Sequence, residues 1–324
     1  MLGSLKSLSG PIAGFVTAMT VLAAPASAAP EVTPLVSTEW LAANLDNDEV
    51  VVIDTRSKIS NSGKDDYLKG HIPGAVWSEY PGYWRTERDG VVGVLPSVEK
   101  LEAALSELGV SEDKALVIIP AGSSSLEFGS AARIFWTMKY LGHDAVAILD
   151  GGHAAWVAED RGLETGDVTP EGDLFVAEVR DELLVSTNEV AEAMGTETVL
   201  LDGRPEAQFS GKQKHGKATR FGHIPGAVNF DQDKFYNKGS NRLKDKAELA
   251  SLLPASLKDS SAKVVSYCNT GHWAATNWFV LTQVLGQENV TLYDDSMVGW
   301  SRDESLPIKA TAKPEQPAKQ VKTN

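Results

Sequence analysis

One heptapeptide occurs twice in this chain of 324 residues, first as Gly70-His71-Ile72-Pro73-Gly74-Ala75-Val76 and again as Gly222-His223-Ile224-Pro225-Gly226-Ala227-Val228. A second pair precedes it, because Val50-Val51-Val52-Ile53-Asp54-Thr55-Arg56 corresponds to Thr198-Val199-Leu200-Leu201-Asp202-Gly203-Arg204. The order and spacing of these landmarks are alike in the two halves. Self-similarity over half of a chain indicates two duplicated domains rather than a solenoid, whose repeats are far shorter.

Each half alternates short apolar runs with amphipathic stretches of helical period. Ser37 and Ser186 stand where helix N-caps are expected. Continuous apolar strands separated by helices predict an α/β fold in which each half is a parallel sheet covered by helices on both faces. We expect domains over 30–161 and 173–308, a linker over 162–172 rich in Gly, Thr, Pro and acidic residues, and a disordered tail over 309–324.

Residues 1–29 have the layout of a secretory signal peptide. Lys6 is their only charged side chain, an apolar stretch runs from about Pro11 to Ala24, and Ala26-Ser27-Ala28 forms a small-residue cleavage site. The apolar stretch is too short to span a bilayer comfortably. Since no twin-arginine pair precedes it and no cysteine follows it, we expect Sec export without a lipid anchor, to a bacterial periplasm.

Cys268 is the only cysteine of the chain, and it lies between an apolar run and a helical stretch. Val264 to Tyr267 predicts a short buried strand, and the residues from Ala274 onward predict a helix. A thiol at such a junction faces backbone N–H groups and the positive end of a helix dipole, which favours the thiolate. The alternative is a small buried hydrophobe, the usual fate of a lone cysteine.

Export strengthens the functional interpretation of this cysteine. In an oxidising compartment cysteines usually come in pairs, as structural disulfides. A single cysteine cannot form an internal disulfide, so it pairs with another chain or stays free to react. The chain also lacks a CxxC motif, which rules out a thioredoxin-type dithiol cycle within it.

The paired Asp-x-Arg and Gly-His-Ile-Pro-Gly-Ala motifs, with a cysteine loop near the end of the second half, resemble the rhodanese family of thiosulfate and 3-mercaptopyruvate sulfurtransferases. The resemblance covers about Thr33 to Pro307 and points to the tandem form, with one inactive and one active domain. The loop of the first half reads Ile119-Pro120-Ala121-Gly122-Ser123-Ser124-Ser125 and has no thiol. By resemblance the first half is the non-catalytic partner, and the active site lies at or near the domain interface. We interpret Ser123 to Ser125 as a polar turn.

The resemblance implies a double displacement that needs no cofactor. The Cys268 thiolate attacks the outer sulfur of a small anionic donor, the leaving group departs, and a persulfide remains. A thiol, cyanide or a partner protein then accepts the sulfur. Backbone N–H groups of the loop would cradle the anionic terminal sulfur; the residues concerned are Asn269, Thr270, Gly271, His272 and Trp273.

The expected substrate-selecting positions leave the donor open. Thiosulfate-type loops resemble Cys-Arg-Lys-Gly and mercaptopyruvate-type loops resemble Cys-Gly-Ser-Gly, whereas this loop is neutral apart from His272. Family members also tend to carry an arginine where this chain has Gln208. We expect thiosulfate as the first donor to test and 3-mercaptopyruvate as the second. Arg220, Lys214 and Lys217 either supply the missing cation or belong to a solvated loop.

Two roles stay open for Arg204, which either contacts the substrate or pairs with Asp202 to brace the loop. The same pairing with Asp54 is the favoured interpretation of Arg56, and His223 and His71 are interpreted as structural. His272 has three possible roles. Protonated, it would stabilise the thiolate or meet an anion; neutral, it would exchange a proton with the acceptor; otherwise it is a solvated loop residue. Trp273 mainly packs and also walls the pocket.

The residues of the cysteine loop also bear on three alternative functions. The rhodanese fold is shared with phosphatases whose loop reads Cys-x5-Arg, but the arginine position here is Ala274, so a phosphate dianion would lack its bidentate partner. A sulfur carrier that loads once and passes the sulfur to a protein is a second candidate, and a redox role of Cys268 is a third. No metal-binding constellation stands out. The formal net charge of −14 without a Lys/Arg cluster argues against nucleic acid or anionic membranes as partners.

Overall fold

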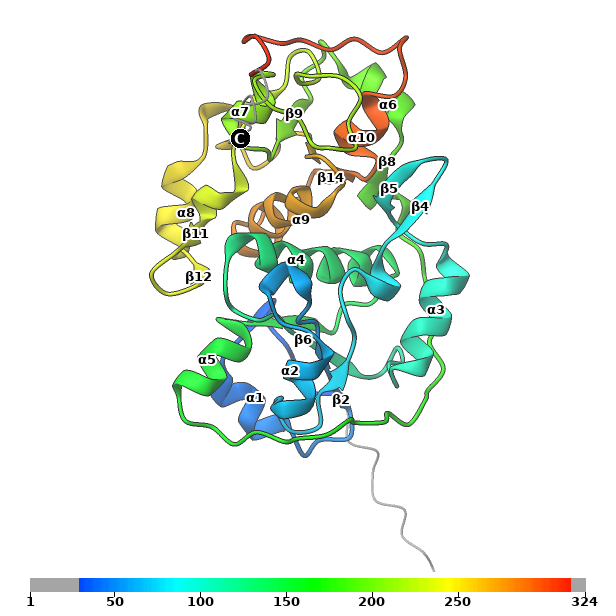
Figure 1. The fold of residues 1–324 in the computed structure, drawn as a ribbon, viewed down its shortest axis with the longest axis vertical. Helices are drawn as coiled ribbons and strands as arrows, with labels where there is room; N and C mark the ends of the chain where they lie inside the picture. The colour runs from blue at the N-terminus through cyan, green and yellow to red at the C-terminus, as the bar shows by residue number, and fades with distance from the viewer. Residues whose placement is uncertain (1–28, 316–324) are drawn as a thin grey trace, which may run out of the picture.

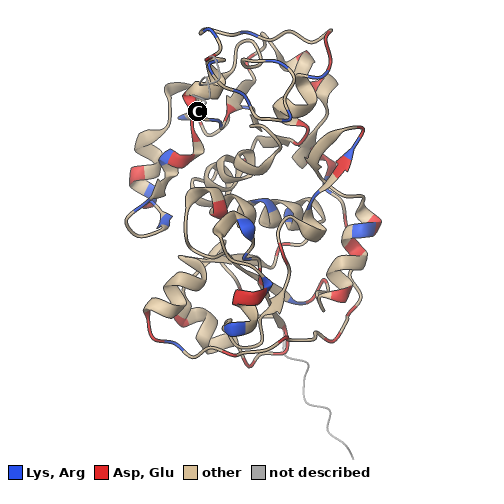
Figure 2. Ribbon diagram, viewed as in Figure 1, with Lys and Arg blue, Asp and Glu red and all other residues tan. Residues whose placement is uncertain are grey.

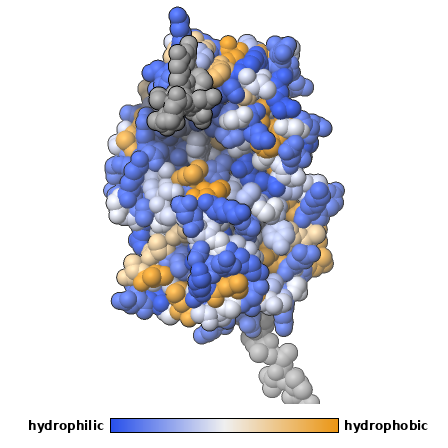
Figure 3. Space-filling model, in the orientation of Figure 1, coloured by the Kyte–Doolittle hydropathy of each residue, from blue (hydrophilic) through white to orange (hydrophobic). Residues whose placement is uncertain are grey.

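The structure, a computed structural model, describes residues 29–315 and contains two α/β domains (Figure 1). The signal peptide expected over 1–29 lies outside the described residues apart from Ala29, and so does the end of the expected tail, 316–324. Within 29–315, no helix has both the length and the apolar character needed to cross a membrane. Most of the surface displayed in Figure 3 is hydrophilic, with apolar residues in small separate patches.

The first domain contains a five-stranded parallel sheet with the order β1-β7-β6-β2-β3. Its strands are β1 (Leu35–Val36), β2 (Val50–Asp54), β3 (Val76–Trp77), β6 (Ala115–Ile119) and β7 (Val146–Leu149). Its helices are α1 (Thr38–Asn44), α2 (Lys64–Lys69), α3 (Val98–Glu107), α4 (Ser125–Tyr140) and α5 (Gly152–Ala158). An antiparallel hairpin, β4 (Thr86–Arg88) with β5 (Val91–Val94), is inserted after β3.

The second domain repeats this plan with the strand order β10-β9-β13-β14-β8, again all parallel. The strands are β8 (Leu184–Val185), β9 (Val199–Asp202), β10 (Val228–Asn229), β13 (Val264–Tyr267) and β14 (Val290–Tyr293). The helices are α6 (Thr187–Ala193), α7 (Glu206–Phe209), α8 (Lys246–Leu252), α9 (His272–Phe279) and α10 (Ser296–Trp300). Its inserted hairpin pairs β11 (Tyr236–Asn237) with β12 (Arg242–Leu243).

Helices cover both faces of each sheet, so the predicted fold class is confirmed. Successive strand residues point to opposite faces: Leu116 and Ile118 of β6 join the cluster under α3 and α4, whereas Val117 and Ile119 join the cluster under α1 and α5. In the second domain Val264 of β13 packs in the cluster with α8 and α9, and the following valine packs with α6 and α10.

The two domains share one hydrophobic core, because α4 and α9 lie side by side between the sheets (Figure 1). Nearly every residue of α4 is buried, and α9 carries no Lys, Arg, Asp or Glu (Figure 2). Phe135 and Phe279 meet edge to face across the helix pair, with ring centroids 4.9 Å apart. Burial on all sides explains why these helices lack the polar face of an ordinary surface helix.

A buried ion pair crosses the same interface. Arg133 of α4 is fully buried, and its Nη2 lies 2.6 Å from Oδ1 of Asp294, which follows β14. The other carboxylate oxygen of Asp294 accepts the Leu95 N–H at 2.6 Å. Removing one partner of a buried pair would leave the other charge uncompensated, so this contact fixes how the domains sit relative to each other.

The two hairpins reach across to the opposite domain in a pseudo-symmetric manner. Arg88 of the β4–β5 hairpin bonds to Asp295 of the second domain at 3.1 Å. Arg242 of the β11–β12 hairpin lies 3.5 Å from Asp150 of the first domain. Each hairpin therefore contacts the segment that follows β7 or β14 in the opposite domain.

The connecting segments are held by backbone hydrogen bonds. The chain between the domains follows the first domain, where the Phe175 and Ala177 N–H groups donate to the Ser106 hydroxyl and the Glu102 carboxylate. At the C-terminal end, Lys309 exchanges two backbone hydrogen bonds with His223, each of 2.9 Å. Thr311 and Ala312 donate to the Ser210 carbonyl. These bonds hold residues 309–315 against the second domain, where the sequence predicted the start of a disordered tail.

Gly129 of α4 packs directly against the His272 ring of α9, and this contact leads to a prediction. A Cβ at Gly129 would lie 2.6 Å from His272 Nε2, and hydrogen bonds to Tyr80 and Leu126 hold that ring in place. Alanine in a helix is favoured over glycine by about 1 kcal/mol, but overpacking costs about 1–3 kcal/mol. We therefore expect Gly129→Ala to lower the free energy of unfolding in urea titrations.

The matched control is Ser130→Ala, on the same buried helix, because the Ser130 Oγ has no hydrogen-bond partner among the described residues. We expect little change for it. If Gly129→Ala were as stable as the control, the ring of His272 would not be fixed as described.

Candidate active site

Cys268 lies in the loop between β13 and α9, at the carboxyl end of the parallel sheet, the usual place for a site in this architecture. Its side chain is only 1% exposed and forms part of the wall of a cavity of about 160 Å³. The cavity lies between the domains. Its other lining residues are Ile59, Arg85, Leu126, His215, Asn269, Thr270, His272 and Trp273.

Ser296 fixes the shape of the cysteine loop. Its Oγ accepts the backbone N–H groups of Cys268 at 3.1 Å and Gly271 at 3.2 Å, and its hydroxyl donates to the Tyr293 carbonyl. Ser296 has φ of 47°, a left-handed conformation that L side chains rarely adopt. The repeat has Gly152 at the same place, with φ of 59°. A serine in this strained position indicates that its hydroxyl is needed by the loop.

The loop retains free backbone donors beside the thiol. Within the described part of the chain, the N–H groups of Asn269 and Thr270 have no acceptor. The first N–H groups of α9 also lack intrahelical partners, as at any helix start. Gly271 does not contribute, because its N–H is bonded to Ser296. The anion cradle expected from the sequence is therefore available from part of the loop only.

His272 is buried between the domains rather than solvated. Its Nε2 donates to the Leu126 carbonyl at 2.6 Å, so its Nδ1 accepts from the Tyr80 hydroxyl at 2.9 Å. Burial, reinforced by the positive charge of Arg85, lowers the pKa of His272 to about 3. The ring is neutral at ordinary pH, and neither nitrogen is free to exchange a proton with a substrate.

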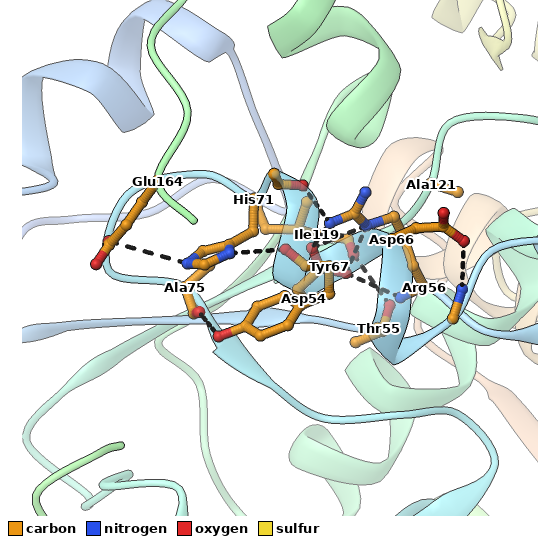
Figure 4. A network of polar contacts seen from close by, with 12 residues as sticks. Asp54, Thr55, Arg56, Asp66, Tyr67, His71, Ala75, Ile119, Ala121 and Glu164 are labelled. Atoms are coloured by element: carbon orange, nitrogen blue, oxygen red, sulfur yellow. Dashed lines mark hydrogen bonds and ion pairs between the residues drawn. The ribbon is translucent and has the colours of Figure 1, made fainter. Parts of the chain in front are cut away.

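Arg204 and Arg56 occupy equivalent buried positions. Arg56 Nε bonds to both oxygens of Asp54 at 3.0 and 2.9 Å, and Nη2 donates to the Gly70 carbonyl (Figure 4). Arg204 makes the same contacts with Asp202 and with the Gly222 carbonyl. Arg204 does not line the cavity of Cys268. These contacts tie each strand end to the glycine that opens the repeated heptapeptide.

The histidines of the heptapeptides are also held by local contacts. His223 stacks on Phe209 with ring centroids 3.7 Å apart, and its Nδ1 is 2.7 Å from the Phe209 carbonyl. In the first domain His71 stacks on Tyr67 in the same way (Figure 4). Both rings stand away from the cysteine cavity.

Gln208 and the basic residues before the second heptapeptide have definite partners. The Asn269 amide donates to Gln208 Oε1 at 2.8 Å, so Gln208 orients a loop side chain instead of holding an anion. Arg220 donates to backbone carbonyls, among them those of Ser301 and Leu306, and does not line the cavity of Cys268. Lys214 donates to the Ala218 carbonyl, whereas no partner of the Lys217 ammonium is found within residues 29–315.

Sequence reasoning missed three polar residues of this site, Ser296, Arg85 and His215, as well as the apolar Ile59 and Leu126. Ser296 left a signal, since it stands where the repeat has a glycine. Arg85 belongs to the other domain, and no local pattern connects it with Cys268. His215 lies in a basic loop segment whose path over the cavity is set by tertiary structure.

The cysteine-less loop of the first domain is filled by its own side chain. Glu127 of α4 accepts the backbone N–H groups of Ala121 at 2.6 Å and Gly122 at 3.0 Å. Burial raises the pKa of Glu127 to about 7. Ser124 caps α4 by accepting the Glu127 N–H, and Ser125 bonds to Asp233 of the second domain. The serine run is a capping and docking segment. Among the described residues, no three or more His, Cys, Asp or Glu side chains cluster as metal ligands.

Known proteins share both halves of this arrangement. Residues 37–159 and 186–303 each match the family described as Rhodanese-like domain. The chain is 32% identical over 283 residues to 3-mercaptopyruvate sulfurtransferase of Escherichia coli, with 85% of this chain and 97% of the relative covered. It is 34% identical to thiosulfate sulfurtransferase of Corynebacterium glutamicum, with 85% and 90% covered. The crystal structure of SseA from Escherichia coli matches with a TM-score of 0.71 and 30% identity, over 82% of this chain and 99% of that one.

Because the Ser296 hydroxyl accepts two backbone N–H groups, we expect its removal to destabilise the protein. Ser296→Ala leaves two buried N–H groups without an acceptor, at about 1–3 kcal/mol for an unsatisfied group. We expect a lower free energy of unfolding and slower alkylation of Cys268 by iodoacetamide. Ser296→Gly removes the same acceptor but relieves the positive φ, so it should be the more stable of the two. The exposed Ser305→Ala is the control, and equal alkylation rates in all variants would contradict the role of Ser296.

The low pKa of His272 predicts a pH dependence of stability. Unfolded His272 takes up a proton near its ordinary pKa of 6.5, whereas the folded ring does so only near 3. The contribution is therefore fully present above pH 6.5 and is lost as the pH falls towards 3, by an amount on the order of a few kcal/mol. We expect the unfolding free energies of wild type and His272→Gln, measured across this range, to converge on acidification. Parallel curves would show that His272 is not buried as the neutral form.

Proposed function

The chain belongs to the rhodanese-like family and carries two copies of its domain, and from this premise we propose that it is a sulfurtransferase acting through a persulfide on Cys268. The observation that carries the proposal is the position of Cys268, the only cysteine, on the wall of a cavity beside free backbone donors. The relatives named as sulfurtransferases cover most of the chain, which supports the class of reaction.

Both half-reactions can be written with Cys268 as the only reacting residue of the protein. The Cys268 thiolate attacks the outer sulfur of thiosulfate, a sulfur–sulfur bond forms, and the bond inside thiosulfate breaks so that sulfite leaves. With 3-mercaptopyruvate the carbon–sulfur bond breaks instead, and pyruvate leaves as an enolate that takes up a proton. In the second half-reaction a thiol or cyanide attacks the terminal sulfur and restores the thiolate.

Loop donors stabilise the charge that this chemistry creates. In this proposal the N–H groups of Asn269 and Thr270, which have no acceptor within residues 29–315, and the start of α9 stabilise the negative charge of the terminal persulfide sulfur. Such preorganised donors lower the barrier because they need no rearrangement during the reaction. Arg204, which is buried on Asp202, acts in this proposal by bracing the domain, while Asn269, Thr270 and Trp273 line the space for the substrate.

The shape of the cavity supports a small donor. A volume of about 160 Å³ around a cysteine that is 1% exposed suits an anion such as thiosulfate or 3-mercaptopyruvate better than a folded protein. One relative is named 3-mercaptopyruvate sulfurtransferase and another thiosulfate sulfurtransferase, so these two compounds are the candidate donors. Thiosulfate is the first to test. A carrier that loads once and a redox thiol are the competing functions. We further propose a periplasmic location, supported by the signal-peptide pattern of residues 1–29.

The test is the intact mass of the protein after exposure to each donor. We expect a gain of one sulfur atom with thiosulfate or 3-mercaptopyruvate and its loss on addition of cyanide. Cys268→Ala is the control and should gain nothing. Continued turnover with excess donor and cyanide separates an enzyme from a carrier, which would load once and stop. An oxygen gain or a mixed disulfide without any persulfide would favour the redox function.

A further inference from the structure

The cysteine cavity contains one permanently charged lining residue, and it comes from the domain without the cysteine. Arg85 follows the short 3-10 helix Gly82–Trp84 of the first domain and immediately precedes the β4–β5 hairpin. Ile59 and Leu126 of the same domain also line the cavity. The cavity wall is thus shared between the domains, and the charge on it belongs to the first.

Backbone contacts on two sides hold Arg85 in place. Its Nε donates to the Gly93 carbonyl of β5 at 2.8 Å, and its Nη2 donates to the Thr270 carbonyl of the cysteine loop. The guanidinium also lies over the Tyr80 ring, 5.8 Å from its centroid. No hydrogen bond of Nη1 is found within residues 29–315. A guanidinium fixed in this way, with donor capacity left over, is suited to bind an oxyanion.

The hairpin leaves space for this guanidinium. Gly93 has φ of +81°, and a Cβ there would collide with the Arg85 side chain. Because Gly93 has no side chain and adopts a left-handed conformation, the hairpin can pack closely around the bulky Arg85 side chain. This packing distinguishes Arg85 from the exposed Arg88 on the same hairpin, which pairs with Asp295 away from the cavity.

A second donor lines the same cavity from the second domain. His215 lines the cavity, and its Nδ1 accepts the Lys217 N–H at 3.3 Å, so the proton of the neutral ring is on Nε2. Burial and then the charges of Arg85, Lys214 and Lys217 lower the pKa of His215. Arg85 shares the lining of the cavity with His215, and Lys214 and Lys217 lie beside His215 in the sequence. The neighbourhood is locally positive in a chain of net charge −14.

From this geometry we infer that Arg85 and His215 form a split oxyanion site, which holds the sulfonate of thiosulfate or the carboxylate of 3-mercaptopyruvate while the donor sulfur faces Cys268. The inference rests on the proposed function for the identity of the donor. The neutral cysteine loop and Gln208 supply no cation, so in this inference the cation is Arg85 of the domain without a cysteine. Arg85 is then a specificity residue that contacts the substrate.

A purely structural role of Arg85 has to be distinguished from substrate contact, because Arg85 also holds the Thr270 carbonyl. Two alkylating agents of nearly equal shape make the distinction: iodoacetate carries a carboxylate and iodoacetamide does not. In both reactions the Cys268 thiolate forms a bond to carbon and iodide leaves. Since Cys268 is the only cysteine, the rate of each mass gain reports this site alone.

We expect wild type to prefer iodoacetate over iodoacetamide more strongly than free N-acetylcysteine does. Arg85→Gln should lower this preference roughly 10- to 100-fold, as expected for a hydrogen bond to a charged group. His215→Ala should lower it less, and Arg85→Lys should restore part of it. Arg88→Gln is the matched control and should leave the preference unchanged. With thiosulfate, Arg85→Gln should raise KM more than it lowers kcat.

Equal slowing of both reagents by Arg85→Gln would overturn the inference, because it would show that Arg85 only positions the loop. An equal loss of preference in Arg88→Gln would also overturn it, by showing that any charge on the hairpin suffices. The proposed function is judged separately. If the preference behaves as expected but no donor forms a persulfide on wild type, the oxyanion site stands and the sulfur transfer is wrong.

Discussion

The packing of α4 against α9 is the contact on which the rest of the molecule depends. Both helices are buried on all sides because each lies between its own sheet and the other helix, and the apolar clusters of the two domains merge there. The buried pair of Arg133 and Asp294 sits at this seam, where loss of one partner would cost about 3–5 kcal/mol. Two halves joined by such a core cannot move as independent domains, so a site shared between them can be as rigid as a site within one domain.

The same backbone cradle has different occupants in the two halves. In the first domain the third residue of α4 is Glu127, and its carboxylate accepts the loop N–H groups. In the second domain the third residue of α9 is Ala274, and the loop N–H groups of Asn269 and Thr270 stay free. The duplicated fold therefore supplies two anion cradles, of which one is satisfied internally and the other is left for a ligand. The first loop thus has no thiol, and its N–H groups are already bonded to an internal carboxylate.

The fold, the duplication and the position of Cys268 between a strand and a helix could be predicted, because each depends on residues that lie near one another in the chain. The heptapeptides, the apolar strands and the strand–loop–helix setting of Cys268 are local patterns. The environment of His272 was not predictable, since Tyr80 and Leu126 reach it only through docking of the domains. The position of Arg85 beside Cys268 was not predictable for the same reason. Ser296 was within reach, because a serine at a glycine position of the repeat signals a function for its hydroxyl.

Electrostatics decides whether an acidic protein can admit an anionic donor. A formal charge of −14 repels anions at long range, but charges farther away than a Debye length of about 8 Å are largely screened at physiological ionic strength. Burial and then the positive charges of Arg85, Lys214 and Lys217 lower the pKa of His215 on the cavity wall. His272 adds none, since it is neutral. Arg85, the permanently charged residue on the cavity wall, therefore gives an anion a local attraction that opposes the net charge, and it is contributed by the domain without a cysteine.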